Sequence, residues 1–114
     1  MDRDTTLQEL KSLLDEFKKE RDWGQFHDPK NLAEAISIEA AELLENFLWK
    51  DIECSGEKTE NIEDELADVI IHCINFANAA DIDITSVVKR KIEKNAEKYP
   101  VDKAKGKHTK YNKF

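Results

Sequence analysis

Apolar residues recur along this chain at spacings of three and four, and no stretch alternates strictly between apolar and polar positions. This periodicity is typical of amphipathic helices rather than of strands. It predicts four helices, over residues 6–21, 28–49, 60–80 and 84–99. Because the 114 residues include only three glycines and two prolines, we expect an all-α fold with a four-helix bundle-like subunit.

Capping signals support the predicted ends of these helices. Thr6 and Glu9 have the spacing of a capping box, in which each side chain accepts a hydrogen bond from the other residue's backbone. Asp28 followed by Pro29 combines a favoured N-cap residue with one suited to the first helical turn. Pro100 disfavours helical backbone at the preceding residue and therefore ends the fourth helix.

The third predicted helix is apolar over a wide arc, which indicates burial on two sides. Its apolar positions include Ile62, Leu66, Val69, Ile70, Cys73, Ile74, Phe76 and Ala77. A short chain offers little to cover both sides, so we expect a partner subunit, in a homodimer or a homotetramer built as a dimer of dimers. Cys73 is expected to be a small core residue.

Charge is unevenly distributed along the chain. The formal net charge is -7, which argues against binding to a nucleic-acid polymer or to a membrane surface. From Lys89 onward, however, lysines predominate. We therefore expect a domain over residues 1–100, with a polar connection at 50–58, and a Lys-rich tail over 101–114 that binds an anion or contacts another subunit.

Cysteine spacing and hydropathy bear on the compartment. Cys54 and Cys73 have neither metal-ligand nor disulfide-framework spacing. The sequence shows no secretory signal pattern, and no apolar stretch approaches the ~20 residues that span a bilayer. These features predict a cytoplasmic protein that does not enter a membrane.

Two acidic pairs with identical spacing are the strongest indication of chemistry. Glu39 and Glu42 lie three residues apart in the second predicted helix, as do Glu65 and Asp68 in the third. Each pair projects from one helical face within an apolar stretch. A short connection favours antiparallel packing, which would bring the pairs opposite each other. Four clustered carboxylates require a cation, and an oxygen-only ligand set suits Mg²⁺.

Other interpretations of the acids remain. An isolated pair of this spacing is more often solvated at the surface or paired with a lysine. Two pairs embedded among apolar residues favour the metal site instead. A carboxylate-bridged di-iron protein is disfavoured, because that class requires a Glu-x-x-His pair and no Glu precedes His72 at that spacing.

Rings, bases and amides supply candidate contacts for a ligand. His72 shares a face with Glu65 and Asp68, where it could touch substrate, bind metal or transfer a proton, or be a satisfied half-buried side chain. The rings could sandwich a flat heterocycle or only fill the core. The rings in question are those of Trp23, Phe26, His27 and Trp49.

Three polar residues of the fourth predicted helix could hold phosphate, or they could only interact with the helix dipole and with water. These residues are Lys91, Asn95 and Lys98.

Taken together, these residues fit a ligand with a ring, phosphates and Mg²⁺, and here the chain resembles the MazG-like nucleoside triphosphate pyrophosphohydrolases. Within them it is most similar to the short, single-domain dCTP pyrophosphatase branch. The likeness covers residues 23–100 and rests on the ExxE and ExxD pairs together with FHDPKNL, FLWK and KIEKNAEKYP, at 26–32, 47–50 and 91–100. It implies Mg²⁺-dependent hydrolysis of a nucleoside triphosphate, of the dCTP type, to the monophosphate and pyrophosphate, with Mn²⁺ as an alternative ion.

The resemblance also implies roles for individual residues. The implied metal ligands are Glu39, Glu42, Glu65 and Asp68. Among them we expect Glu42, and next Glu39, to act catalytically on the attacking water. The implied substrate contacts are His27 and Trp49 around the base, Lys91 and Asn95 at the phosphates, and Trp23 and His72 beside the ligand. His72 replaces a tyrosine of the branch, which leaves the base and sugar preference open.

Two classes of function remain open on the sequence. The first is a hydrolase that removes unwanted or excess nucleotides. The second is a non-catalytic, oligomeric helical module whose acidic face binds a nucleotide or a basic partner. Burial of the acids among apolar neighbours favours the hydrolase, because a docking face would leave them on an open polar surface.

Overall fold

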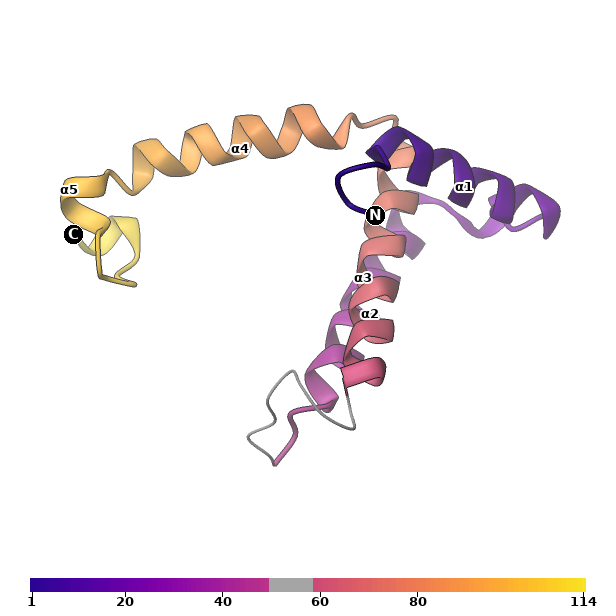
Figure 1. Ribbon diagram of the computed structural model, residues 1–114, viewed down its shortest axis with the longest axis horizontal. Coiled ribbons are helices and arrows are strands. Elements are labelled where there is room, and N and C mark those ends of the chain that lie inside the picture. The colour runs from indigo at the N-terminus through magenta and orange to yellow at the C-terminus, as the bar shows by residue number, and fades with distance from the viewer. Residues whose placement is uncertain (50–58) are drawn as a thin grey trace. The chain divides into compact units, whose positions relative to one another are not determined.

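A computed structural model of the chain describes residues 1–49 and 59–114 (Figure 1). Its helices are α1 (Leu7–Glu20), α2 (Pro29–Glu45), α3 (Thr59–Ala80), α4 (Ile84–Lys98) and α5 (Val101–Ala104), with 3₁₀ turns η1 (Gly24–Phe26) and η2 (Tyr111–Lys113). The described residues contain no strand, so the predicted all-α fold is confirmed. The predicted connection at 50–58, with Lys50, Cys54 and Gly56, lies outside the described residues.

The chain divides into two compact units, Met1–Ile82 and Asp83–Phe114. The first contains α1, η1, α2 and α3, and the second contains α4, α5 and η2. The domain predicted over residues 1–100 stays a prediction. None of the helices in the described ranges has the length and apolar character needed to span a membrane.

The predicted starts of α1 and α2 are confirmed. The Thr6 hydroxyl accepts a hydrogen bond from the Glu9 N–H at 3.1 Å, and the Glu9 carboxylate accepts one from the Thr6 N–H at 3.0 Å. Asp28 accepts a hydrogen bond from the Asn31 N–H at 2.8 Å, and Pro29 occupies the first turn. These contacts satisfy backbone donors that have no partner within the helix.

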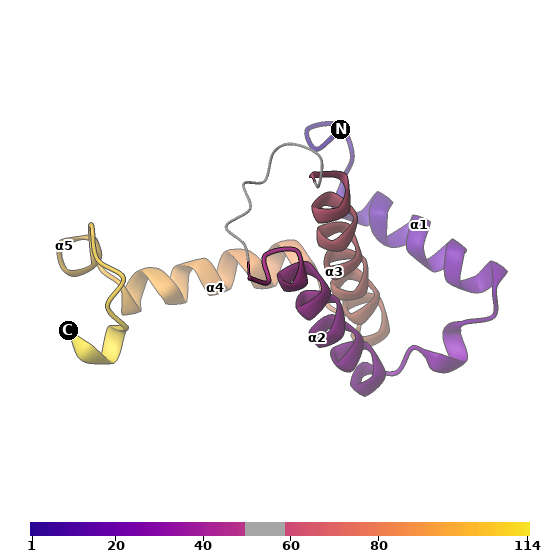
Figure 2. The ribbon, with the colours of Figure 1, turned by 90° about the horizontal axis from the view of Figure 1, so that it is seen from below.

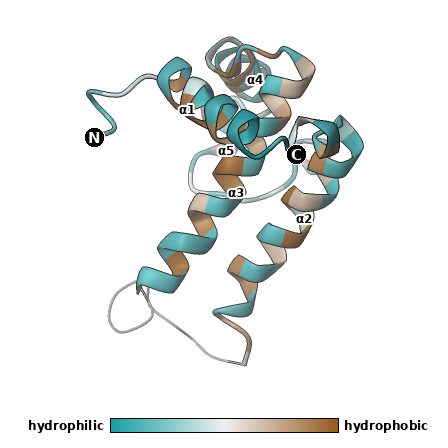
Figure 3. Cartoon of the chain, turned by 90° about the vertical axis from the view of Figure 1, so that its right-hand side faces the viewer, coloured by the Kyte–Doolittle hydropathy of each residue, from teal (hydrophilic) through white to brown (hydrophobic). Residues whose placement is uncertain are grey.

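Helices α2 and α3 pack side by side and antiparallel, as predicted (Figures 1 and 2). Glu39 lies opposite His72, and the side-chain amide of Asn61 at the start of α3 donates to the side-chain oxygen Oδ1 of Asn46 just after α2. Figure 3 shows hydrophobic stretches recurring along both helices. The buried apolar side chains of the unit are Leu32, Ile62, Ile74 and Ala77.

Leu32 has only 2% of its surface exposed, which allows a test of this core. Leu32→Ala should lower the free energy of unfolding by about 2–5 kcal/mol, because it removes buried apolar contacts and leaves a cavity. Leu44, on the same helix, is 69% exposed, and Leu44→Ala should change stability by about 0.5 kcal/mol or less. Urea unfolding followed by far-UV circular dichroism compares the two. Equal losses would contradict the packing of α2 on α3.

Helix α1 is joined to α3 through backbone carbonyls. The Lys11 ammonium donates to the Ile82 carbonyl oxygen, and the Asn78 side-chain amide donates to the Lys11 carbonyl oxygen at 3.1 Å. Part of the apolar stripe of α1 remains uncovered, since Leu13 is 61% and Phe17 is 45% exposed. Polar contacts to the backbone therefore help to fix α1 where apolar burial is incomplete.

The predicted end of α2 at Trp49 is wrong, because the helix ends at Glu45. The Asn46 side-chain amide donates to the carbonyl oxygens of Glu42 and Leu43, at 3.3 and 3.1 Å. The backbone N–H groups of Asn46, Phe47 and Leu48 donate to carbonyl oxygens three residues earlier, which ends the α-helical pattern. Residues 46–49 form turns instead.

The expectation that Cys73 belongs to the core is also wrong, since this residue is exposed. It lies on a face of α3 shared with Leu66 and Ile70, which are 48% and 47% exposed. Helices α1 and α2 contact α3 but do not bury these positions. The first unit therefore covers only part of the wide apolar arc of α3.

The second unit is built around α4. The Asp83 carboxylate caps this helix by accepting from the Ser86 N–H at 3.0 Å. The Lys-rich tail is structured, because Tyr99 packs edge-on against Tyr111 and Phe114, with ring centroids 6.0 and 5.9 Å apart.

Two apolar positions of α4 are not covered by the rest of the second unit. Val88 and Ile92 are 49% and 61% exposed. Within this unit the tail packs on Tyr99, at the C-terminal end of α4, rather than over these positions. The apolar periodicity of α4 therefore predicted the helix correctly, but it did not identify which residues bury its apolar face.

Candidate active site

Carboxylates from α2 and α3 meet between the two helices. Glu39, Glu42 and Glu65 each place one carboxylate oxygen within 4.8 Å of the others, and all three side chains are half-buried. Helical spacing explains why these carboxylates lie close together. Glu39 and Glu42 are one turn apart on α2, and the antiparallel α3 brings Glu65 opposite them. We call these three residues the acid cluster.

Mutual repulsion and burial perturb the protonation of this cluster. Burial raises the pKa of Glu39, and the neighbouring carboxyl groups of Glu42 and Asp68 raise it further. The same causes raise the pKa of Glu65, with the charge of Glu39 adding to them. A raised pKa means that the ionised cluster lacks compensating positive charge.

The donor set fits a hard divalent cation. Among the described residues, Glu39 Oε2 and Glu65 Oε2 are buried without a hydrogen-bond partner. Buried carboxylate oxygens are rarely left unsatisfied, and a cation would pair with them. Carboxylate oxygens are the ligands that Mg²⁺ prefers, so the residues present match the predicted ion. Asp68 lies outside the acid cluster but close enough to raise the pKa of both Glu39 and Glu65.

His72 connects the acid cluster to an adjoining cavity. Its Nε2 lies 3.6 Å from Glu39 Oε1, and its Nδ1 is buried without a partner among the described residues. The cavity has a volume of about 340 Å³ and lies within the first unit, between α1 and α3. We call it the ring pocket. Its lining comprises Leu14, Phe17, Lys18, Trp23, His27, Asp68, Ile71, His72 and Asn75.

Aromatic side chains form one wall of the ring pocket. Trp23 packs edge-on against Phe17, with ring centroids 5.7 Å apart, and the Arg21 guanidinium lies 3.6 Å above the Phe17 ring centre. These contacts hold flat apolar surface beside the pocket. Such a surface suits a planar heterocycle. Asp68 lines the same cavity, so a heterocycle bound there would lie next to the acid cluster.

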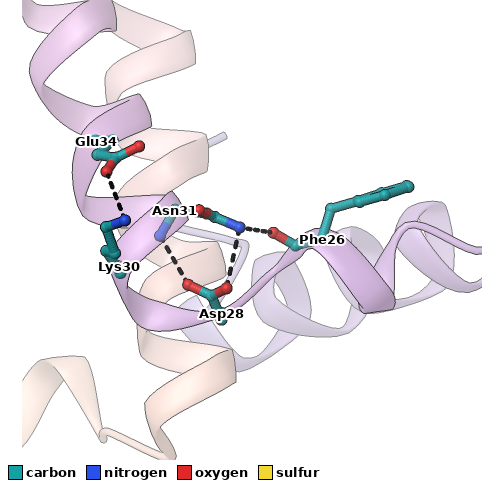
Figure 4. Close-up of polar contacts among 5 residues, drawn as sticks. All are labelled: Phe26, Asp28, Lys30, Asn31 and Glu34. Atoms are coloured by element: carbon teal, nitrogen blue, oxygen red, sulfur yellow. Dashed lines mark hydrogen bonds and ion pairs between the residues drawn. The ribbon is translucent and has the colours of Figure 1, made fainter.

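The FHDPKN segment fixes the approach of the chain to α2 (Figure 4). The Asn31 side-chain amide donates to the Phe26 carbonyl oxygen at 3.2 Å and to Asp28 Oδ2 at 3.0 Å. Lys30 and Glu34 form an exposed ion pair at 3.6 Å on the next turn. These bonds hold the backbone on both sides of His27, and so present its ring to the ring pocket.

The surroundings of His27 favour its neutral form. Burial lowers the pKa of His27, and the charges of Lys18 and His72 lower it further. A neutral imidazole offers one donor and one acceptor nitrogen, so His27 can pair with a polar ligand without adding charge.

The structure brings together most, but not all, of the predicted site residues. The acid cluster, Asp68, His72, His27 and Trp23 all lie in the first unit, around the ring pocket. Trp49 is 93% exposed, with a left-handed backbone φ of 61°. Lys91 and Asn95 belong to the second unit, so their contact with phosphates stays a prediction.

Two pocket residues were missed in the sequence. Lys18 follows Leu14 and Phe17 at spacings of four and one, on the pocket side of α1. Asn75 follows Asp68 and His72 at spacings of seven and three, on one face of α3. Helical periodicity alone was a sufficient signal for Asn75, because it extends the face of the acids.

The fold and site define a small all-helical protein with a half-buried carboxylate cluster beside a ring pocket. Residues 35–114 match the profile of the MazG-like family, and the chain belongs to this family. Its curated relatives include dCTP pyrophosphatase 1 of Bos taurus and of Homo sapiens, 36% and 37% identical over 112 residues. These alignments cover 93% of this chain and 66% of each relative. A solved pyrophosphatase structure from Archaeoglobus fulgidus is 42% identical, with a TM-score of 0.69 over 82% of this chain and 91% of that one.

Proposed function

We propose that this protein hydrolyses a nucleoside triphosphate, of the dCTP type, to the monophosphate and pyrophosphate, with Mg²⁺ as cofactor. The observation that carries the proposal is the half-buried acid cluster with two unpartnered carboxylate oxygens, adjoining a pocket for a ring. The printed names of the relatives, dCTP pyrophosphatase 1 and a pyrophosphatase, support the same reaction.

In this proposal, Glu39, Glu42 and Glu65 hold the cation, with Asp68 at the edge of the set. When bound, Mg²⁺ supplies positive charge to the phosphate oxygens and makes a neighbouring water more acidic. Glu42 receives the proton of the attacking water, with Glu39 as the second candidate. The water oxygen bonds to the α-phosphorus as the bond to the bridging oxygen of the β-phosphate breaks, and pyrophosphate leaves with the bond's electron pair.

The remaining predicted residues position the substrate. Trp23, His27 and His72 lie around the ring pocket and surround the base in the proposed complex. We assign Trp49 to the base, and Lys91 and Asn95 to the phosphates, by the resemblance to the dCTP pyrophosphatase branch. Binding through ring and phosphates positions the α-phosphorus at the acid cluster, which is the main requirement of phosphoryl transfer.

A nucleotide panel tests the reaction directly. The purified protein is incubated with each common ribo- and deoxynucleoside triphosphate and Mg²⁺, and the products are separated by chromatography. We expect equal amounts of monophosphate and pyrophosphate, formed only without EDTA. Release of inorganic phosphate and a diphosphate would contradict attack at the α-phosphorus, and silence across the panel would favour a non-catalytic binding module.

We also propose that the protein forms a homodimer or homotetramer through the uncovered face of α3. Leu66 and Ile70 are about half exposed on this face. Ile70→Glu should shift the protein toward monomer, because it places a charge in an apolar interface. Ile70→Val, which keeps an apolar side chain at the same position, is the matched control. Sedimentation equilibrium measures the mass, and a wild-type monomer at all concentrations would contradict the proposal.

A further inference from the structure

The imidazole of His72 faces one carboxylate of the acid cluster. Its Nε2 lies 3.6 Å from Glu39 Oε1, and both side chains are half-buried. Asp68 precedes His72 by one turn on α3 and lines the same pocket. Among the described residues, however, His72 forms an ion pair with Glu39 and not with Asp68. The two side chains that meet across α2 and α3 are therefore those of Glu39 and His72.

The buried Nδ1 of His72 indicates which of its nitrogens carries the proton. Within the described parts of the chain this nitrogen has no hydrogen-bond partner, although Lys18, His27 and Asn75 line the same pocket. A buried N–H without a partner is rarer in proteins than a buried acceptor without one. In the neutral imidazole the proton is therefore on Nε2, the nitrogen beside Glu39, which makes Nε2 a hydrogen-bond donor.

The two oxygens of the Glu39 carboxylate have different surroundings. Oε1 lies beside Nε2 of His72, whereas Oε2 is buried without a partner among the described residues. A donor that holds one oxygen restricts rotation of the carboxylate and leaves the other oxygen available to a cation. Carboxylates that bind metal ions are ordinarily hydrogen-bonded in this way by a neighbouring residue.

We infer that His72 is a positioning residue that orients Glu39 for the cation, by donating a hydrogen bond from Nε2 to Glu39 Oε1. The inference rests on the proposed function, because it takes the acid cluster as the cation site. At 3.6 Å the contact is longer than a hydrogen bond, and such contacts in active sites commonly shorten when the ligand binds. His72 is not itself a ligand, since it does not belong to the acid cluster.

Binding of Mn²⁺ without nucleotide tests this inference, with electron paramagnetic resonance measuring the free ion. His72→Phe keeps a ring but removes the donor, and it should weaken Mn²⁺ binding by about 10-fold or more. His72→Gln, whose amide nitrogen can take the place of Nε2, should recover most of the lost affinity. His72→Asn has a shorter side chain and should not recover it. This last variant keeps the test open if His72→Phe does not fold.

Two further measurements separate positioning from direct ligation and from a general effect on the fold. In a Glu39→Ala background, His72→Phe should not weaken Mn²⁺ binding further, because His72 acts through Glu39. Pulsed electron paramagnetic resonance should detect no imidazole nitrogen bound to the ion in the wild type. His108→Phe is the matched control, since His108 is exposed and does not line the ring pocket, and it should leave the affinity unchanged.

Four results would overturn the inference. One is wild-type Mn²⁺ affinity in both His72→Phe and His72→Asn, in proteins with wild-type circular dichroism. The others are additive losses in the double variant, a nitrogen ligand that disappears in His72→Gln, and no binding of Mn²⁺ by the wild type.

The chromatographic panel separates this inference from the proposed reaction. Pyrophosphate release by a protein whose Mn²⁺ affinity does not depend on His72 would overturn the inference and leave the reaction standing. Mn²⁺ binding that depends on His72, in a protein that releases no pyrophosphate, would uphold the inference and overturn the reaction.

Discussion

Glu39→Gln is expected to lower nucleoside triphosphate turnover by at least about 100-fold while leaving the fold intact. Glu39 lies in the acid cluster, and its Oε2 is buried without a partner among the described residues. Glutamine keeps the size of the side chain but removes the negative charge that holds a divalent cation. Loss of one charged group at the reacting centre typically costs a factor of 100 to 1,000 in rate.

Steady-state pyrophosphate release at saturating Mg²⁺ measures this loss. Glu34→Gln is the control, because Glu34 lies on the same helix but is exposed and paired with Lys30 at 3.6 Å. It should retain wild-type turnover. Asp68→Asn should also impair turnover, since Asp68 lies between the acid cluster and the ring pocket. Full activity of both Glu39→Gln and Asp68→Asn would contradict the metal site.

The fold and the acid cluster were predictable because one periodicity governs both. A spacing of three places Glu39 beside Glu42 on α2, and the apolar residues around them require that face to be covered. A short connection then favours an antiparallel neighbour, which brings Glu65 opposite. Each step depends only on helix geometry and on local sequence.

The sequence predictions failed in two situations. In one, side-chain hydrogen bonds compete with backbone hydrogen bonds at a helix end. In the other, an apolar face is not buried by the neighbouring helices. At the end of α2 the Asn46 side-chain amide donates to two backbone carbonyl oxygens, and the backbone bonds of the next residues tighten to a spacing of three, which apolar periodicity does not reveal. Cys73 is apolar by type and by position, yet neither α1 nor α2 buries it within the first unit. Periodicity identifies an apolar face but not the element that covers it.

The ring pocket depended on tertiary structure. Phe17 and Lys18 meet Asn75 only because α1 lies against α3, and that contact is fixed by the bonds between Lys11 and the end of α3. No local pattern in α1 distinguishes Lys18 from its exposed neighbour Lys19. The lining of the ring pocket was therefore less visible in the sequence than the acids proposed to hold the metal.

The acid cluster should also make the metal-free protein sensitive to pH. The folded pKa values of Glu39 and Glu65 lie above the usual 4.5, so the folded state binds protons more tightly than the unfolded chain. The resulting stability is fully present below that unfolded value and is lost as pH rises through the raised folded values. In EDTA, the thermal midpoint should therefore fall as pH rises from about 5 toward 8.

Mg²⁺ should oppose this loss, because a ligand that binds only the folded state stabilises it in proportion to the logarithm of its excess concentration. At pH 8, Glu39→Gln should raise the metal-free midpoint above that of the wild type, because it removes one repelling charge, and should weaken the response to Mg²⁺. Glu34→Gln should behave as the wild type in both conditions. Thermal unfolding followed by circular dichroism at pH 5 and 8, in EDTA and in Mg²⁺, measures all four effects. A variant less stable than the wild type without metal, with an unaltered Mg²⁺ response, would mean that Glu39 stabilises the fold and does not hold the ion.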